Sequence, residues 1–535
     1  MANRYWVGGT GTWNTSSTTN WSATSGGASG ASVPTTADSV FFDQAGTYTV
    51  TLSGSGLRCL DFTTSAGTVT IAGSGGSELI VTGSMTLVAG TVWSQESGNL
   101  GFGSVTTGKT ITTNGVTIGA NLYFGSLGAG GGWTLGSALT TNAARTLTLE
   151  DGTLDLGTYT LSVGSFDSSN SRTRTIAFGT GNIVVRGSGG WTTNTTTGLT
   201  TTGTQVVNVS YTGAVATTVL SGSLNEANSI SFNFTAGTYA LTLSSGTKRN
   251  LNFTGFAGTV GSAAPTIYGD LNLGSTATLT SSANSWNLRG TAGPYSITTN
   301  GKTVVFPLIL NGVGGTWVLQ DALTMLSTRS LSHTNGTLDL NGKTLTVGTS
   351  YTTATGTKNL TFNGGTLVCP GVTTTAFNNA APTNYTTTAG TGTGTISMTG
   401  ATAKTFVGGG STFNCTLNQG GAGALTITGN NTFNNITNTV QPASVLFTAG
   451  TTTTFNNFSL SGTAGSLITI GSVTAASHTL SKASGTVSGD YLSISRSTAT
   501  GGATWNATNS TNGGNNTGWI FSSTVGNTGS FFSIL

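Results

Sequence analysis

The fold is decided by residues 412–456, which read TFNCTLNQGGAGALTITGNNTFNNITNTVQPASVLFTAGTTTTFN. The motif threonine-phenylalanine-asparagine begins at Thr412, at Thr432 and at Thr454, so its spacings are 20 and 22 residues. Between the copies lie short alternating apolar and polar runs such as Leu425–Thr428, bounded by glycine and asparagine. A short repeat with two or three strands and Gly/Asn corners is typical of one coil of a β-solenoid.

The chain also repeats on a larger scale. Ala45–Tyr48 recurs as Ala236–Tyr239 at an offset of 191, and Gly152–Leu156 recurs as Gly336–Leu340 at an offset of 184. A third start at Phe447–Thr451 lies 22 residues later than the first offset predicts, which is about one short repeat. An added coil lengthens a solenoid without disturbing its neighbours, whereas a β-sandwich would need a new strand pair.

The fold class that follows is all-β, in the form of an elongated parallel β-helix or β-solenoid with roughly 20-residue coils. About 25 such coils would stack at ~4.8 Å. Tandem β-sandwich domains are the alternative. Asparagine and glycine are expected at left-handed corners, and asparagines stacked at equivalent corners are expected to form ladders.

Composition supports an all-β chain with a thin core. Only 6% of the 535 residues are charged, against about 25% in an ordinary soluble protein, and 36% are hydrophobic. Glycine occurs 83 times and proline 7 times. No stretch shows the apolar period of an amphipathic helix over three turns.

The repeats predict five segments. These are an N-terminal Trp/Gly-rich cap or attachment segment (1–43), solenoid copy A (44–228), solenoid copy B (229–443), a partial third copy (444–497) and a C-terminal cap or tail (498–535).

Both ends differ from the rest. Trp6, Trp13 and Trp21 are cap candidates, because an open solenoid end exposes apolar core and unpaired backbone groups that bulky aromatics can cover. The apolar end Phe531–Leu535 is read either as a segment that docks on a neighbouring subunit or as a disordered end.

Two stretches carry a family resemblance. The N-terminal one resembles the opening of bacterial and phage β-helical surface proteins, including those with autotransporter-associated β-strand repeats. It comprises Trp6–Gly9, Gly11–Trp13, Asn20, Trp21, Pro34 and Asp38–Phe42. The C-terminal one resembles tail-fibre and virion-associated proteins of bacterial viruses. It comprises Thr432–Thr437, Asp490–Ser495 and Gly513–Phe521.

The densest acidic cluster is Glu150, Asp151 and Asp155. Glycan cleavage needs two carboxylates about 5–10 Å apart, so the cluster is the one candidate for acid–base chemistry. Only Asp155 has an acidic counterpart in the second copy, Asp339. We therefore interpret these residues as solvated turn residues with a structural aspartate at a corner, and we assign no catalytic residue.

Other chemistry is not indicated. His333 and His478 are read as surface histidines, and the separated Cys59, Cys369 and Cys415 as small buried hydrophobes. No metal site or cofactor is predicted. A net charge of +3, spread thinly, does not indicate nucleic-acid binding. We expect no signal peptide and no membrane insertion. Thr-x-Thr runs fall at irregular spacing, which does not favour an ice-binding array.

Some residues recur in both long copies and are interpreted as structural, not as ligand-binding. The pairs are Arg58 and Arg249, Arg145 and Arg329, Asp155 and Asp339, and Trp133 and Trp317.

The expected function is that of a phage virion structural protein, a fibre, spike or decoration protein at the virion surface, which adheres to glycans and is not an enzyme. Expected partners are other virion proteins, cell-surface or environmental glycans, and further copies of the chain in a homo-oligomer, taken to be a trimer. The alternatives are an adhesin or matrix protein at the bacterial cell surface and a polysaccharide depolymerase on the same scaffold.

Overall fold

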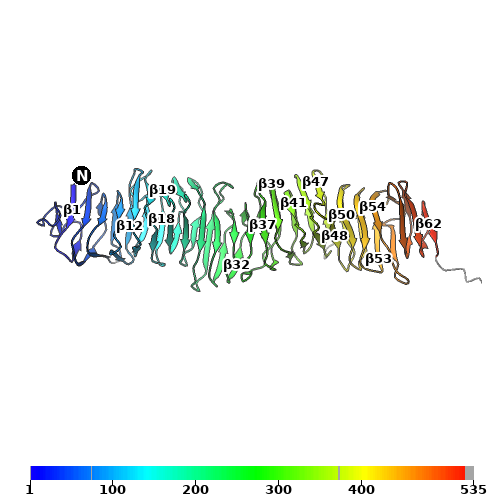
Figure 1. Ribbon diagram of the computed structural model, residues 1–535, viewed down its shortest axis with the longest axis horizontal. Coiled ribbons are helices and arrows are strands. Elements are labelled where there is room, and N and C mark those ends of the chain that lie inside the picture. The colour runs from blue at the N-terminus through cyan, green and yellow to red at the C-terminus, as the bar shows by residue number, and fades with distance from the viewer. Residues whose placement is uncertain (1, 74, 372–373, 524–535) are drawn as a thin grey trace, which may run out of the picture. The chain divides into compact units, whose positions relative to one another are not determined.

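The computed structural model describes residues 2–73, 75–371 and 374–523. The secondary structure of these residues consists of β-strands, without an α-helix. The strands form parallel sheets that are stacked as a β-solenoid of about 21 turns of about 22 residues (Figure 1). The predicted β-solenoid is therefore confirmed, with slightly fewer and longer coils than expected. The terminal stretch Phe531–Leu535 lies outside the described residues.

Most strands show the alternation expected of a half-buried pleat. In β5 (Thr47–Leu52) the side chains of Tyr48, Val50 and Leu52 are buried while the intervening threonines stay at the surface. Because successive side chains point to opposite faces, one set fills the narrow interior and the other covers the outside.

The chain divides into two compact units. Unit 1 extends to Tyr268 and includes Thr276–Thr280, and unit 2 comprises Gly269–Ser275 and the chain from Ser281 onward. The division lies inside the second sequence copy, and the five segment boundaries stay a prediction.

Unit 1 has three faces, and each face is one ladder of strands. In stacking order, the first face contains β3 (Trp21–Ser22), β1 (Ala2–Trp6), β4 (Asp38–Phe42), β7 (Phe62–Thr64), β10 (Met85–Thr86), β13 (Lys109–Thr112), β16 (Gly132–Leu135), β19 (Gly152–Asp155), β22 (Arg174–Ala177) and β25 (Leu199–Thr202). The second contains β2 (Gly11–Trp13), β5, β8 (Thr68–Gly73), β11 (Val92–Gln95), β14 (Thr117–Ile118), β17 (Leu139–Thr141), β20 (Thr160–Val163), β23 (Asn182–Val185), β26 (Val206–Val209), β28 (Ser231–Phe234) and β31 (Leu251–Asn252), whereas β30 (Thr247–Lys248) pairs with β33 (Thr266–Ile267) in a separate ladder. The third contains β6 (Leu57–Cys59), β9 (Glu78–Val81), β12 (Asn99–Phe102), β15 (Asn121–Phe124), β18 (Thr146–Leu149), β21 (Ser165–Asp167), β24 (Trp191–Thr193), β27 (Thr217–Ser221), β29 (Ala240–Leu243), β32 (Thr259–Ser262) and β35 (Thr278–Leu279).

Unit 2 also has three faces, and its longest strands bend from one face to the next. One face contains β36 (Trp286–Leu288), the first halves of β39 (Leu308–Leu319) and β41 (Leu331–Asp339), β43 (Tyr351–Thr353), β46 (Thr375–Asn378), β49 (Lys404–Val407), β51 (Leu425–Thr428), β53 (Ala443–Phe447), β55 (Ile468–Ser472), β58 (Leu492–Ile494) and β61 (Thr511–Asn512). A second contains β34 (Leu271–Asn272), β37 (Tyr295–Thr298), the second halves of β39 and β41, β44 (Lys358–Thr361), β47 (Tyr385–Thr388), the first halves of β50 (Thr412–Gln419), β52 (Thr432–Asn438) and β54 (Thr452–Ser459), and then β56 (His478–Ser481) and β59 (Ser497–Thr500). The third contains β38 (Thr303–Val304), β40 (Leu323–Met325), β42 (Thr344–Thr346), β45 (Thr366–Cys369), β48 (Gly394–Met398), the second halves of β50, β52 and β54, and then β57 (Thr486–Asp490), β60 (Thr504–Thr508) and β62 (Trp519–Ser522).

The corners use the residues expected there. Asn114 and Asn300 occupy equivalent positions in the two long repeats, and both adopt the left-handed conformation, at φ 47° and 52°. An asparagine ladder also forms, but within strands and not at the corners where ladders were expected: Asn233 donates to Asn208 at 3.0 Å on successive coils, and Asn208 donates to Asn182 at 3.5 Å. Because asparagine tolerates positive φ and has both a donor and an acceptor, one residue type serves corners and ladders.

The N-terminal end is closed by aromatics and by one antiparallel strand. The Trp21 ring lies edge-on to the rings of Trp6 and Trp13, with centroids 5.2 and 5.0 Å apart. All three side chains are buried, and β3 pairs antiparallel with β1, so that it covers the outer edge of the first face. The three tryptophans thus lie together beneath the first strands of the solenoid.

Removal of one coil tests the modularity of the solenoid. Thr432 and Thr454 are register partners, so deletion of residues 432–453 places Thr454 where Thr432 stood. We expect a folded, β-rich protein with cooperative unfolding, because each coil contacts only its neighbours. Circular dichroism and urea unfolding check this. A deletion of 11 residues is the control, since it shifts the register by half a coil and should abolish cooperative unfolding. Equal behaviour of the two deletions would contradict the modular account.

Candidate functional site

The main candidate surface is a strip of outward-facing threonine and asparagine side chains on unit 2, here called the Thr/Asn strip. Register pairs Thr316 with Thr337, Thr337 with Asn359, and Asn359 with Thr386, so each strand adds one polar side chain to the same column. The column continues onto β50, because the Asn414 side chain donates to the Thr387 backbone oxygen at 2.7 Å. The remaining members are Thr388, Thr412, Thr432, Asn434, Thr454 and Asn456.

Three adjoining hollows lie along this strip. The first has a volume of about 280 Å³ and is lined by residues that include Thr337, Lys358 and Asn359. The second, about 510 Å³, shares Thr386 with the first. The third, about 410 Å³, shares Asn414 with the second. Because the hollows share walls, they form one shallow groove that crosses successive coils.

Aromatic stacking beneath the strip holds its columns in register. The Phe413 and Phe433 rings stack with centroids 5.1 Å apart at 15°, and Phe433 stacks on Phe455 at 6.1 Å and 18°. Each phenylalanine is flanked in sequence by the outward Thr and Asn of the motif quoted first. The fixed interior stack therefore fixes the outward spacing of three coils, at ~4.8 Å each.

The strip contains uncharged hydrogen-bonding groups. The Oδ1 atom of Asn359 accepts from the hydroxyls of Thr386 and Thr388, at 2.9 and 3.1 Å. Lys358 lines the groove, but its side chain is buried and donates to the backbone oxygens of Gly356 and Thr383. No carboxylate lines any of the three hollows. The arrangement is suited to binding a neutral polyhydroxylated chain.

Asp155 and Asp339 perform the same local task in both copies. The Oδ1 atom of Asp155 accepts from the Gly157 backbone N–H at 2.9 Å, and that of Asp339 accepts from the Asn341 N–H at 2.8 Å. In each case the aspartate side chain accepts a hydrogen bond from the backbone two residues later and so stabilises a turn that begins at the aspartate. Asp339 also accepts from the Asn363 side chain on the next coil, at 2.9 Å.

Trp133 and Trp317 are both buried and both lie against glycine. A Cβ on Gly131 would stand 2.7 Å from the Trp133 ring, and one on Gly312 would stand 2.4 Å from the Trp317 ring. Real Cβ atoms do not approach so closely, so the Gly–Trp contact is the feature that recurs in both copies.

The four repeated arginines have different environments. Arg329 donates to the Val305 backbone oxygen at 3.0 Å and to the Ser281 hydroxyl at 2.9 Å. Arg249 donates to the Glu226 backbone oxygen at 3.3 Å. Arg145 is half-buried, and its Nε atom has no hydrogen-bond partner within the described ranges. Arg58 lines a cavity near the N-terminus.

The acidic cluster does not form an open carboxylate pair. Asp151 is buried, which corrects its interpretation as a solvated turn residue, and its carboxylate accepts from the Gly130 N–H at 3.1 Å. Glu150 faces Arg172 at 3.6 Å near the surface. Asp151 also interacts electrostatically with Arg174. Burial lowers the pKa of the Arg174 guanidinium, and the carboxylates of Asp151 and Asp167 oppose this shift only in part.

The prediction of surface histidines is wrong for both residues, since His333 and His478 are fully buried. The Nδ1 atom of His333 lies 2.6 Å from the Tyr351 hydroxyl, and its Nε2 atom lies 3.0 Å from the Gly336 backbone oxygen. His478 hydrogen-bonds Ser472 at 2.9 Å and stacks on Phe447. A neutral imidazole that hydrogen-bonds a neighbour is tolerated in a core, which explains the error. Both ring nitrogens of His333 have partners, whereas the Nε2 atom of His478 has none within the described ranges.

An acid titration tests the burial of His333. Burial, aided by the charge of Lys358, lowers the pKa of His333 to about 4, although the Gly336 carbonyl opposes this shift. The unfolded chain then binds the extra proton between pH 6.5 and 4. Stability is therefore full above pH 6.5, and about 3 kcal/mol of it is lost by pH 4.

We expect His333→Gln to remove this part of the pH dependence, measured by urea unfolding at pH 7 and pH 4. His478→Gln should leave the His333 contribution in place and remove a separate one, because burial lowers the pKa of His478 to about 4 as well, so the two substitutions together should remove both contributions. An unchanged pH dependence in the His333 variant would contradict the burial argument.

The sequence analysis did not predict the burial of four cationic side chains, which are Arg174, Lys248, Lys358 and Lys404. The ammonium of Lys404 donates to the backbone oxygens of Gly423 and Gly400, at 2.6 and 3.0 Å. The sequence pattern could have indicated three of them. Arg174, Lys358 and Lys404 occupy the same alternating positions as the inward-facing apolar residues of their strands. A charged residue at inward parity predicts a buried cation that binds carbonyls at a corner.

All three cysteines are free and buried, as expected for small buried hydrophobes. Over the described ranges, no group of three or more His, Cys, Asp or Glu side chains could hold a metal ion. A search of the same ranges finds no helix long and apolar enough to cross a membrane.

The fold and the strip define a parallel β-solenoid with a polar groove, lined by no carboxylate, on one unit. No protein-family model, curated protein or solved structure matches the chain.

Proposed function

We propose that this protein is a non-enzymatic adhesive solenoid that binds neutral glycan chains along the Thr/Asn strip. The observation that carries the proposal is the groove of three adjoining hollows lined by threonine and asparagine with no carboxylate. Hydroxyl and amide groups offer both donors and acceptors, which sugar hydroxyls require.

The spacing of the strip supports a chain-like ligand. Successive coils rise ~4.8 Å, which is close to the length of one sugar residue in an extended polysaccharide. A ligand running along the strip would therefore meet an equivalent Thr or Asn at each residue. Many weak contacts on one rigid surface add up through effective concentration.

The setting that we propose is the surface of a phage particle, with the chain as a fibre, spike or decoration protein. The support is the resemblance of Thr432–Thr437 and Gly513–Phe521 to tail-fibre and virion-associated proteins, together with a charged fraction of 6% that limits nonspecific electrostatic attachment. The proposed partners are other virion proteins and further copies of this chain.

Substitution of three stacked asparagines tests glycan binding. We expect Asn414→Ala, Asn434→Ala and Asn456→Ala together to weaken binding of a neutral polysaccharide at least tenfold, because each loses a donor and an acceptor. The unit 1 ladder Asn182→Ala, Asn208→Ala and Asn233→Ala is the matched control, and it should bind like the wild type. Glycan-array screening followed by isothermal titration calorimetry measures both variants.

Two results would contradict the proposal. Equal loss in both triple variants would mean that the asparagines act on folding and not on binding. Release of new reducing ends from the bound polysaccharide would favour the depolymerase alternative. For the setting, immunogold labelling of purified particles should place this chain at the virion surface, and label on bacterial cell walls alone would favour the adhesin alternative.

A further inference from the structure

A cavity of about 270 Å³ lies at the N-terminal edge of unit 1, far along the chain from the Thr/Asn strip. It exists because the third face begins at β6, whereas the other two faces already contain β1 and β2. Residues 33–36, not a strand, lie over the start of β6. Pro34 has no backbone N–H to donate, so this segment does not continue the ladder.

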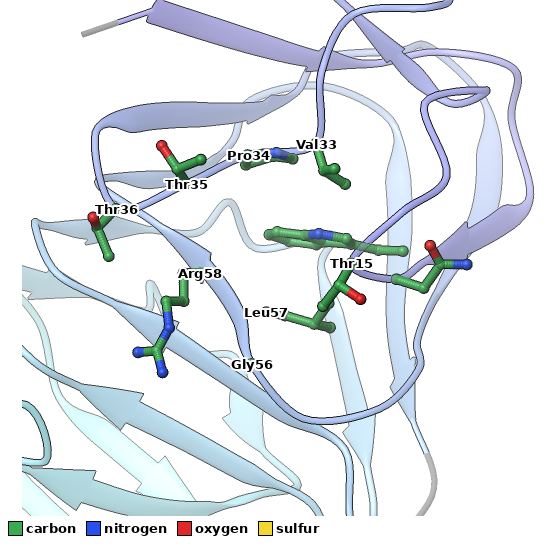
Figure 2. Close-up of a pocket in the computed structure, with 10 residues that line it drawn as sticks. Thr15, Val33, Pro34, Thr35, Thr36, Gly56, Leu57 and Arg58 are labelled. Carbon is green, nitrogen blue, oxygen red and sulfur yellow. The ribbon is translucent and has the colours of Figure 1, made fainter.

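The walls of the cavity are apolar on two sides and polar at the edge. Figure 2 shows Val33 and Pro34 above the cavity, Leu57 below it, and Arg58 at its edge beneath Thr36. The rest of the lining is Trp13, Asn14, Thr15, Thr35 and Gly56. The volume lies below the usual range of about 300–1,000 Å³ for drug-sized ligands, so it suits a single small ring.

Arg58 is the charged group of this cavity, and its guanidinium is free. Within residues 2–73, 75–371 and 374–523 it forms neither a hydrogen bond nor an ion pair. Its repeat counterpart Arg249 instead donates to a backbone oxygen. The nearby Asp38 carboxylate is already held by Thr35 and Arg4. Arg58 therefore keeps all its donors for a ligand.

We propose that this cavity binds one acidic sugar ring, such as a uronic acid residue, through a fork of hydrogen bonds from Arg58 to the sugar carboxylate. Guanidinium and carboxylate match in geometry and charge. Val33, Pro34 and Leu57 contact the apolar face of the ring, and Asn14, Thr15 and Thr36 face its hydroxyls. This site is separate from the neutral glycan groove and does not depend on it.

A titration with small probes tests the site. Galacturonate, its methyl ester and galactose are titrated against the full chain by saturation-transfer NMR. We expect galacturonate to bind in the millimolar range, the two uncharged sugars at least tenfold more weakly, and binding to weaken as salt is added, because the cation is partly exposed.

Variants separate the role of Arg58 from folding. Arg58→Ala and Arg58→Glu should lose galacturonate binding at least tenfold, and Thr15→Trp should lose it by filling the cavity. Arg172→Ala, which removes an exposed arginine of unit 1, should retain it, as should the strip variant with three asparagines replaced. Circular dichroism confirms that each variant is folded.

Any one of three results overturns the inference: no galacturonate binding by the wild type, equal binding of galactose, or full binding by folded Arg58→Ala. Acetate competing as well as galacturonate overturns it too, since the cavity would then recognise a carboxylate without a ring. Loss of neutral polysaccharide binding by the strip variant leaves this site unaffected, so the two proposals fail separately.

Discussion

Replacement of Trp6 and Trp13 by alanine is expected to unfold the first coil and to make the protein aggregate. Both rings are buried against Trp21, and the Trp6 Nε1 atom donates to the Gly9 backbone oxygen at 2.7 Å. Loss of a buried tryptophan typically costs about 3–5 kcal/mol. Once the first coil is lost, the edges of β4 and β5 become available for pairing with another chain.

Urea unfolding and light scattering measure this effect. The matched control is Tyr159→Ala, which removes an exposed aromatic of the same unit and should change stability by less than about 0.5 kcal/mol. A double tryptophan variant that stays soluble with an unchanged unfolding midpoint would show that residues 1–43 are an appendage and not a cap.

Arg174→Leu is expected to destabilise unit 1 by about 3–5 kcal/mol, because it removes the donors from several buried acceptors at once. The side chain is fully buried and donates to the backbone oxygens of Thr195 and Thr197, at 2.7 and 3.0 Å. It also bonds the Ser168 hydroxyl at 2.8 Å and its backbone oxygen at 3.2 Å.

Arg172→Leu is the control, two residues before Arg174 and just outside β22. Its guanidinium is 57% exposed and faces Glu150 at 3.6 Å, and such surface pairs contribute about 0–1 kcal/mol. Urea unfolding followed by tryptophan fluorescence measures both variants, since Trp191 is buried in β24. Equal stability of the two variants would mean that the buried guanidinium contributes no more than a surface one.

The two buried histidines show where sequence reasoning failed. His333 and His478 stand at inward parity in β41 and β56, alternating with Leu331 and Leu480. Their burial was therefore readable from the pattern. Residue type alone suggested the surface, but partners such as Tyr351 and Ser472 make burial acceptable, and those partners lie 18 and 6 residues away in the chain.

The candidate sites could be predicted only in part. The motif at Thr412, Thr432 and Thr454 already implies repeated outward Thr and Asn side chains. The link from Thr387 to Asn414 was not visible, because it depends on how β47 lies against β50. Likewise, Arg58 recurs as Arg249, and this repetition favoured a structural role for both residues. Nothing in the repetition indicates the cavity that Arg58 lines.

The sequence by itself determined the all-β class, the coil length and the inward or outward side of each strand residue, because these follow from local periodicity and from Gly and Asn at corners. Only the tertiary structure decided which outward residues share a column. Loops of different length, such as the one between Thr388 and Gly394, set the register from coil to coil. Threonines that look irregularly spaced in the chain therefore align in space, while Arg58 faces a cavity because the third face begins at β6.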